Sequence, residues 1–181
     1  MLFTLAISLN GLFLALGAWA SLRHFARTER EPRGASLLTA ATVLGTALNV
    51  WLALRHPDPT PLEIAVSIAL MLVALAVFAA AIRATRLGGL SLAFSDATPG
   101  AVVETGIYGV IRHPFYTSYI LYWLNWLPLS AFDPLSCGVA VAMIAAYTAA
   151  ARKEERLLTS RLGSPYAGLM QRTWRFLPGV H

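Results

Sequence analysis

The chain has 181 residues, of which 57% are hydrophobic and 13% are charged, and its formal net charge is +5. Soluble domains are typically about 25% charged, so this composition excludes an ordinary soluble globular protein and an intrinsically disordered chain. A single cysteine, Cys137, also excludes a disulfide framework and a cysteine-based zinc site.

Five apolar segments follow one another along the chain. They cover approximately residues 2–22, 35–54, 62–82, 115–132 and 134–151. The first three match the roughly 20 residues that a helix needs to cross a bilayer, whereas the fourth is shorter and rich in Tyr and Trp. Asp133-Pro134 forms the whole turn between the last two. We therefore predict an all-α integral membrane protein with about five transmembrane helices, the last two forming a tight hairpin.

The basic residues predict the orientation of these helices. All but one of the 14 Lys and Arg residues lie in segments 23–34, 83–114 and 152–181. Five crossings place these segments on one side of the membrane, and the positive-inside rule assigns that side to the cytoplasm and the N-terminus to the outside. The chain is rich in Ala and uses Arg rather than Lys, a composition that suggests a GC-rich prokaryote. We therefore expect the protein in a prokaryotic plasma membrane. The basic residues are not interleaved with aromatics in a stripe, so we expect no nucleic-acid partner.

The predicted cytoplasmic segments divide the chain into two parts. Residues 1–82 hold three transmembrane helices, and residues 83–181 hold a long loop, the hairpin and a long tail. Long segments gathered on one face commonly carry function, so we expect the site where the loop and the tail meet.

The loop ends in Arg112-His113-Pro114. Proline suits the first turn of a helix, so Pro114 is predicted to begin the fourth segment. Arg112 and His113 then lie at a helix N-terminus, where free N–H groups and the helix dipole favour a carboxylate or phosphate. The alternative is that both side chains only reach the membrane surface and fix the topology.

The tail begins with two adjacent acids, Glu154 and Glu155. We expect the fifth helix to continue to about Leu162 and to end at Gly163. Adjacent side chains on a helix point about 100° apart, so one carboxylate can face a pocket while the other faces water or an arginine. The alternative is a solvated charge cluster with weak local ion pairs.

The rest of the tail alternates aromatic and basic residues, including Arg172, Trp174 and Arg175. This pattern is typical of a segment that lies along the membrane surface. A second interpretation is a lid that folds back over the site, with Arg172 or Arg175 supplying charge.

The polar residues within the apolar segments are of types that fit helix packing or a pocket wall better than a transporter. Asn10 and Asn49 are predicted to hydrogen-bond between helices, and Asn125 with its aromatic neighbours suits a pocket wall. No Asp or Glu lies in the middle of a segment, which argues against a proton-coupled transporter or ion pathway. No two histidines face each other in the predicted bundle, so we expect no metal site.

Several of these residues form an ordered set that resembles the isoprenylcysteine carboxyl methyltransferase family. The set comprises Gly106, Tyr108, Arg112-His113-Pro114 and Tyr116, a hydrophobic hairpin, Glu154-Glu155, Tyr166, and Arg175-Phe176-Leu177-Pro178. It also resembles the wider group that includes phospholipid methyltransferases. The resemblance runs from about Arg83 to Pro178, slightly more than half of the chain.

The resemblance implies an S-adenosylmethionine-dependent methyltransferase made of membrane helices, with a lipid or lipid-like acceptor that arrives from the bilayer. The cytoplasmic loop, the hairpin and the tail would form the cofactor pocket and release S-adenosylhomocysteine. The cofactor-binding residues implied are Gly106, Tyr108, Arg112, His113, Pro114, Tyr116, Glu154, Glu155 and Tyr166. Those assigned to catalysis are Arg172, Arg175 and Glu154.

Three positions depart from the family pattern and leave the acceptor open. Ile107 replaces a frequent Pro, Ser118 replaces a Gly, and Leu169 replaces a Tyr. An isoprenoid or prenylcysteine-type carboxylate is the first expectation, and a phospholipid amine or a hydrophobic thiol is the alternative. A non-catalytic membrane protein that binds lipid or haem is the competing class of function. The sequence leaves the oligomeric state open.

Overall fold

The computed structural model describes residues 1–24, 33–56, 58–88 and 104–179. Within these ranges the chain is helical and forms no strand. Four of the described helices are long and apolar enough to cross a membrane, as an integral membrane protein requires. They are α1 (Leu2–His24), α2 (Arg33–Arg55), α3 (Pro61–Gly88) and α6 (Pro134–Leu162). The prediction of an all-helical membrane protein is therefore confirmed with four such helices.

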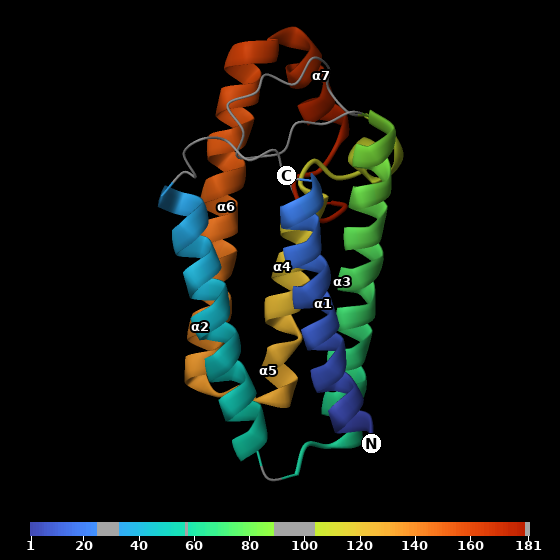
Figure 1. The fold of residues 1–181 in the computed structure, drawn as a ribbon. Coiled ribbons are helices and arrows are strands. Elements are labelled where there is room, and N and C mark those ends of the chain that lie inside the picture. The colour runs from blue at the N-terminus through green and yellow to red at the C-terminus, as the bar shows by residue number, and fades with distance from the viewer. Residues whose placement is uncertain (25–32, 57, 89–103, 180–181) are drawn as a thin grey trace.

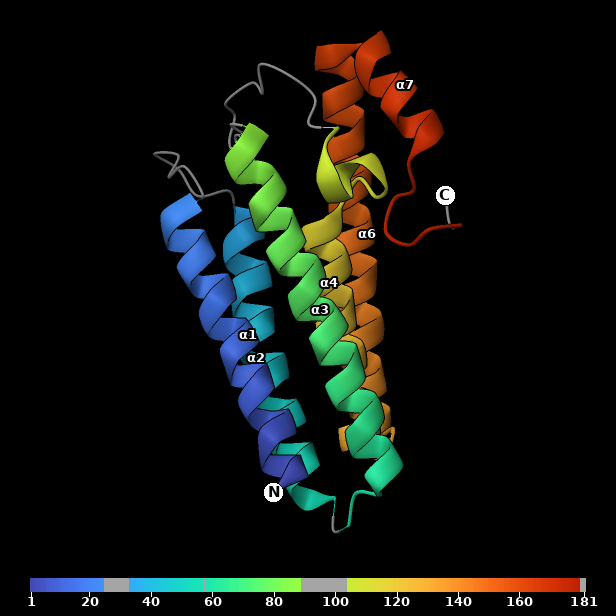
Figure 2. The same cartoon turned by 90° about the vertical axis from the view of Figure 1, so that its right-hand side faces the viewer.

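The long helices stand side by side, and successive helices run in opposite directions (Figures 1 and 2). The N-terminus and the connection between α2 and α3 lie at one end of the bundle. The opposite end carries α7 (Ser164–Arg172), and we call it the α7 end. The last turns of α3 and α6 also reach the α7 end, so the described basic residues of these helices gather there.

The fourth predicted segment differs from one continuous helix. It forms α4 (Pro114–Leu124) and α5 (Trp126–Leu129), which have 11 and four residues, so neither can cross a membrane alone. The break at Asn125 has a local cause. Pro128 has no main-chain N–H to donate to the carbonyl of Leu124, so a regular helix cannot continue through this turn.

The short helix α4 lies among the long ones, between α3 and α6 and behind α1 (Figure 1). Its 11 residues span about 17 Å, whereas the 29 residues of α6 span about 43 Å. Both α3 and α6 continue toward the α7 end beyond the level where α4 begins (Figure 2). The first residues of α4 are consequently recessed between the longer helices α3 and α6.

Polar bonds between helices hold the break in place. The side-chain amides of Asn10 and Asn125 donate to each other over 3.1 Å and 3.0 Å, and Ser67 also donates to Asn125 over 3.1 Å. Asn49 on α2 accepts a bond of 2.5 Å from Ser136 on α6. The predicted interhelical bonds of Asn10 and Asn49 are confirmed, and they satisfy groups that hydrocarbon could not.

Aromatic side chains fill the space around α4. Phe13 stacks on Tyr122 with ring centres 5.1 Å apart and contacts Phe78 at 5.6 Å. Trp123 is fully buried, and its indole N–H donates to the hydroxyl of Tyr147 over 3.3 Å. These rings supply the large contact area that fixes α4 against its neighbours.

Proline and capping residues set where the helices begin. Pro114 and Pro134 occupy the first turns of α4 and α6, and the carboxylate of Asp133 accepts the N–H of Leu135 over 2.8 Å. The predicted two-residue turn between the last two segments is longer, because α5 ends at Leu129 and residues 130–133 form the connection.

The C-terminal segment contains a helix that the sequence analysis did not predict. Helix α6 ends at Leu162 as expected, and Gly163 adopts a positive φ of 62°. Helix α7 then begins at Ser164, with Pro165 in its first turn, and turns back over the bundle (Figure 1). Much of the predicted basic segment 23–34 and loop 83–114 lies outside the described residues, namely at 25–32 and 89–103.

Candidate functional site

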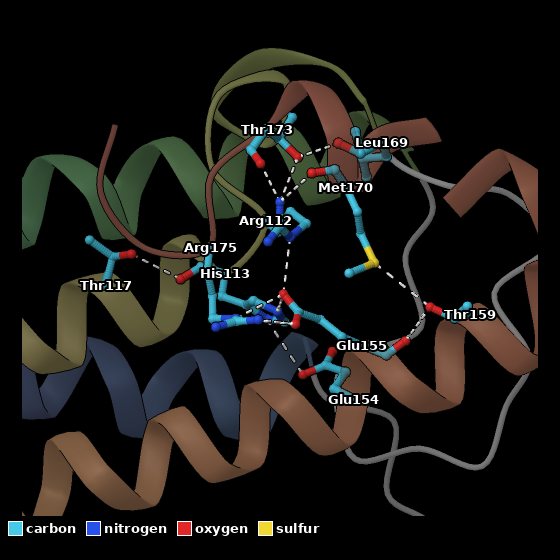
Figure 3. A network of polar contacts seen from close by, with 10 residues as sticks. All are labelled: Arg112, His113, Thr117, Glu154, Glu155, Thr159, Leu169, Met170, Thr173 and Arg175. Carbon is cyan, nitrogen blue, oxygen red and sulfur yellow. Dashed lines mark hydrogen bonds and ion pairs between the residues drawn. The ribbon is translucent and has the colours of Figure 1, made fainter. Parts of the chain in front are cut away.

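The candidate site lies at the recessed N-terminus of α4. Pro114 is the first residue of α4, so Arg112 and His113 directly precede the helix, and both side chains are buried. Glu154 and Glu155 face this point from α6, and the residues after α7 approach it from above (Figure 3). The structure therefore brings together the Arg-His-Pro and Glu-Glu motifs that the sequence separates by about 40 residues.

Glu155 is at the centre of the charged cluster. Its Oε1 accepts a bond of 3.0 Å from Nε of Arg112 (Figure 3). Arg175 donates to Oε1 over 3.1 Å and to Oε2 over 2.8 Å and 3.1 Å. Nε2 of His113 lies 3.3 Å from the same Oε1. The bond to Glu155 raises the pKa of Arg175 above its usual value. The carboxylate of Glu155 is thus neutralised by the chain itself.

Arg112 ties the C-terminal segment to the site. One of its terminal nitrogens donates to the carbonyl of Met170 over 3.0 Å and to the carbonyl of Thr173. With Glu155 as a further partner, its guanidinium links the start of α4 with α6 and with the end of α7. The anion that the sequence predicted beside Arg112 is, in this structure, the carboxylate of Glu155.

Residues 173–176, which we call the strap, pair with the chain just before α4. Ile111 and Trp174 form an isolated parallel bridge. The N–H of Arg112 donates to the carbonyl of Trp174 over 2.8 Å, and the N–H of His113 donates to that of Arg175 over 3.1 Å. The strap therefore pairs with the main chain of the two residues that precede α4, and the tail folds back as the lid interpretation expected.

Glu154 has different surroundings from Glu155. Its Oε2 is buried and has no hydrogen-bond partner among the described residues, and it lies 3.8 Å from Nδ1 of His113. The Tyr116 hydroxyl is close enough to interact electrostatically with this carboxylate. The adjacent acids thus divide as their helical spacing predicts: Glu155 faces two arginines, and Glu154 keeps an oxygen free for another donor.

Tyrosines surround the free carboxylate. The ring of Tyr116 stacks between His113, at 5.5 Å, and Tyr147, at 5.7 Å. Burial raises the pKa of Tyr108 and of Tyr166, and the nearby carboxylates add to both shifts. The hydroxyls of Tyr108 and Tyr166 therefore remain protonated at neutral pH and can donate hydrogen bonds. The aromatic faces beside an acid suit a positively charged ligand group.

Two of the predicted site residues lie apart from the charged cluster: Gly106 shapes the main chain, and Arg172 lies on the surface. Gly106 begins the short 3₁₀ helix η1 (Gly106–Gly109) with a positive φ of 61°, which favours glycine. Arg172 is 58% exposed and pairs with Glu104 over 2.6 Å. The structure thus joins Arg172 to the segment before η1, and it is Arg175 that reaches Glu155.

Sequence reasoning missed Thr117, Thr173 and Tyr147. Thr117 donates to the carbonyl of Phe176 over 2.9 Å and Thr173 donates to the carbonyl of Leu169 over 2.6 Å, so both fix the strap. Tyr147 lies two turns before Glu154 on α6 and extends the aromatic surface. Its spacing of seven residues from Glu154 places it on the same helix face, which is the one signal that the sequence offered.

Comparison with known protein families and curated sequences identifies no relative of this chain. No protein-family model matches the chain, and no curated protein sequence matches it. The function is therefore argued from the site itself and from the resemblance described above.

Proposed function

We propose that the protein is an integral membrane methyltransferase that uses S-adenosylmethionine and methylates a lipid or lipid-like acceptor at the cytoplasmic membrane face. The observation that carries the proposal is the unpaired carboxylate oxygen of Glu154, buried beside the stacked rings of His113 and Tyr116. A buried polar atom without a hydrogen-bond partner is costly, so such an atom is commonly kept for a ligand.

The residues fit the charges of the proposed cofactor. Its methionine end carries an ammonium and a carboxylate, and its sulfur is a cation that supplies an activated methyl group. Glu154 is the proposed partner of the ammonium, and the ring of Tyr116 suits the sulfonium through a cation–π contact. Arg175 is the proposed partner of the carboxylate, because its side chain is the more exposed of the two arginines on Glu155.

The remaining residues of the implied set are proposed to line the pocket or to hold its walls. Tyr108 and Tyr166 would donate hydrogen bonds, and Gly106 and Pro114 would set the course of the main chain. Arg112, His113 and Glu155 would fix α4, α6 and the strap relative to one another. Arg172 is proposed to act on the pocket only indirectly, through its pair with Glu104.

Methyl transfer of this kind depends mainly on alignment and on exclusion of water. The recessed start of α4 and the overlying strap support both. A carboxylate acceptor needs no general base, so an isoprenoid-type carboxylate is the first proposal for the acceptor. An amine or thiol acceptor must lose a proton, and Glu154 or His113 is the proposed proton acceptor in that case.

The topology proposed for this function has five crossings. The pair α4 and α5 would cross most of the hydrocarbon inside the bundle, where Asn10 and Ser67 satisfy the polar side chain at the break. The α7 end would face the cytoplasm, and the N-terminus would face outward. The acceptor would enter from the surrounding lipid.

A non-catalytic lipid- or haem-binding protein is the competing proposal. It predicts that the two motifs stay apart on the surface, whereas Nε of Arg112 and Oε1 of Glu155 are 3.0 Å apart. This distance favours a built site over two separate topology signals.

Binding of S-adenosylhomocysteine to the purified protein tests the proposal by titration calorimetry. We expect micromolar affinity in the unaltered chain and a loss of about 10- to 100-fold in Glu154→Gln, because an ion-paired hydrogen bond is lost. Asp58→Asn removes an exposed acid and is the matched control. A folded sample that binds no S-adenosylhomocysteine would overturn the cofactor assignment.

The acceptor is identified in a second experiment. The protein is incubated with S-adenosylmethionine carrying a radiolabelled methyl group and with a total lipid extract, and the labelled product is analysed. A base-labile methyl ester indicates a carboxylate, whereas a stable product indicates an amine or a thiol. Cofactor binding without any labelled lipid would overturn the lipid acceptor and retain the cofactor site.

A further inference from the structure

The carboxylate of Glu155 has more cationic partners than it needs. Arg112 contacts Oε1, and Arg175 contacts both oxygens, with distances between 2.8 Å and 3.1 Å. His113 is a third neighbouring residue, with its Nε2 3.3 Å from Oε1. Two permanently charged arginines therefore face one negative charge, and the loss of either one would still leave Glu155 neutralised.

The two arginines are held in different ways. The side chain of Arg112 is 4% exposed, and besides Glu155 it donates to main-chain carbonyls of Met170 and Thr173. The side chain of Arg175 is 20% exposed, and among the described residues its hydrogen bonds go to Glu155 alone. Arg112 is thus fixed by three parts of the chain, whereas Arg175 has one anchor and access to solvent.

The strap does not depend on the Arg175 side chain for its position. Main-chain bonds join Arg112 to Trp174 over 2.8 Å and Trp174 to Val110 over 3.0 Å. The Thr117 hydroxyl holds the carbonyl of Phe176 over 2.9 Å. The guanidinium of Arg175 can therefore change its partner by side-chain rotation while the main chain stays in place.

We propose that Arg175 is an exchangeable arginine that leaves Glu155 to bind the carboxylate or phosphate of a ligand, while Arg112 keeps Glu155 paired. The exchange avoids the large cost of a buried unpaired carboxylate, because Glu155 retains Arg112 and His113 throughout. A guanidinium also forms two parallel bonds with either anion.

The inference deepens the proposed function, since the anion would be the carboxylate of the cofactor or an acidic lipid group. It assigns Arg175 a role that Arg112 cannot fill, although both contact Glu155 in this structure. In the absence of such an anion Glu155 acts as its substitute and keeps the guanidinium near the site.

Calorimetry with three ligands tests the exchange. S-Adenosylhomocysteine carries the carboxylate, 5′-methylthioadenosine lacks the amino-acid part, and dodecyl phosphate represents a lipid anion. We expect Arg175→Gln to weaken S-adenosylhomocysteine by about 10- to 100-fold and 5′-methylthioadenosine by less than about twofold. Arg161→Gln, which removes an exposed arginine of α6, is the matched control and should change neither.

Side-chain NMR observes the partner change directly. The Nε–H signals of Arg175 and Arg112 are assigned with Arg175→Lys and Arg112→Lys, and each ligand is then added. We expect the Arg175 signal to move with S-adenosylhomocysteine and not with 5′-methylthioadenosine, while the Arg112 signal stays within its linewidth. A shift with dodecyl phosphate alone assigns the anion to the lipid instead of the cofactor.

The outcomes separate this inference from the proposed function. S-Adenosylhomocysteine that binds without moving the Arg175 signal, together with no shift from dodecyl phosphate, overturns the exchange and leaves the methyltransferase proposal standing. An equal loss of both adenosine ligands in Arg175→Gln also overturns it, because the residue then only supports the fold. If no adenosine ligand binds, the methyltransferase proposal fails and dodecyl phosphate alone decides the exchange.

Discussion

Nε of Arg112 and Oε1 of Glu155 lie 3.0 Å apart, and their side chains are 4% and 6% exposed. The pair joins the start of α4 to α6, and the guanidinium of Arg112 also donates to the carbonyl of Met170 near the end of α7. Removal of one partner from such a pair strongly destabilises the fold, because the other partner is left as an unpaired buried charge.

Glu155→Gln is therefore expected to lower the free energy of unfolding by about 3–5 kcal/mol. Glu154→Gln is the neighbouring control, and it should retain stability because Oε2 of Glu154 has no hydrogen-bond partner among the described residues and lies 3.8 Å from Nδ1 of His113. Thermal unfolding in detergent, followed by circular dichroism, measures both. Equal melting temperatures for the two variants would contradict the central role of Glu155.

The reciprocal bonds between Asn10 and Asn125 predict an energetic coupling between α1 and the α4–α5 break. A double-mutant cycle with Asn10→Ala and Asn125→Ala should give about 0.6–1.7 kcal/mol, which lies between the average and the maximum for hydrogen bonds between membrane helices. Asn49→Ala provides the comparison, since Asn49 bonds to Ser136 instead. Coupling of Asn49 to Asn125 as strong as that of Asn10 would refute the pairwise interpretation.

Gly45 is predicted to be intolerant of any side chain. A Cβ there would lie 2.9 Å from Cη2 of Trp123 and 3.1 Å from Cγ1 of Val139. Gly45→Ala should therefore cost about 1–3 kcal/mol, since the rigid indole cannot yield without moving α4. Gly11→Ala is the control, because nothing lies within 4 Å of that Cβ. It should leave the melting temperature unchanged or raise it.

The orientation is testable with single cysteines in a Cys137→Ser background. Asp58→Cys and Ser160→Cys lie at exposed positions at opposite ends of the bundle. A membrane-impermeant maleimide should label the cysteine of Asp58→Cys on intact cells, and that of Ser160→Cys only after permeabilisation. The reverse order of labelling would invert the proposed topology.

Two tyrosines with raised pKa values, Tyr108 and Tyr166, predict a loss of stability at high pH. The pKa values of Tyr108 and Tyr166 are raised in the folded state, so both stay protonated where the unfolded chain already ionises. Their contribution is complete below the unfolded pKa of about 10 and declines as pH rises above it. Tyr166→Phe should reduce this alkaline dependence, as measured by melting temperature between pH 8 and 11.5. An unchanged slope would show that Tyr166 ionises freely.

Hydropathy and proline placement predicted most of the helical bundle. The segments at 2–22, 35–54 and 62–82 became α1, α2 and α3, because about 20 apolar residues have few other stable forms in a bilayer. The fourth segment was predicted as one helix because its hydropathy runs through Asn125. Pro128 and the polar partners of Asn125 explain the break. Pro128 is visible in the sequence, whereas the partners of Asn125 are known only from the structure.

The sequence predicts which residues form the charged cluster, but it does not predict most of the contacts between them. Arg112, Glu155 and Arg175 were singled out, yet their mutual bonds depend on how the strap returns over α4. The strap pairs through main-chain atoms, which carry no sequence signal. Thr117 and Thr173 hold it through hydroxyl hydrogen bonds to main-chain carbonyls, which a threonine in many positions can make.

The strap also imposes an order on biosynthesis. Ribosomes deliver Arg112 and the whole of α4 to the membrane before Thr173 and Trp174 exist, although these later residues supply the carbonyls that Arg112 contacts. Until then, Arg112 is a newly inserted cation without its main-chain acceptors. Nascent chains arrested before the strap should therefore present an unfinished site to insertases and proteases.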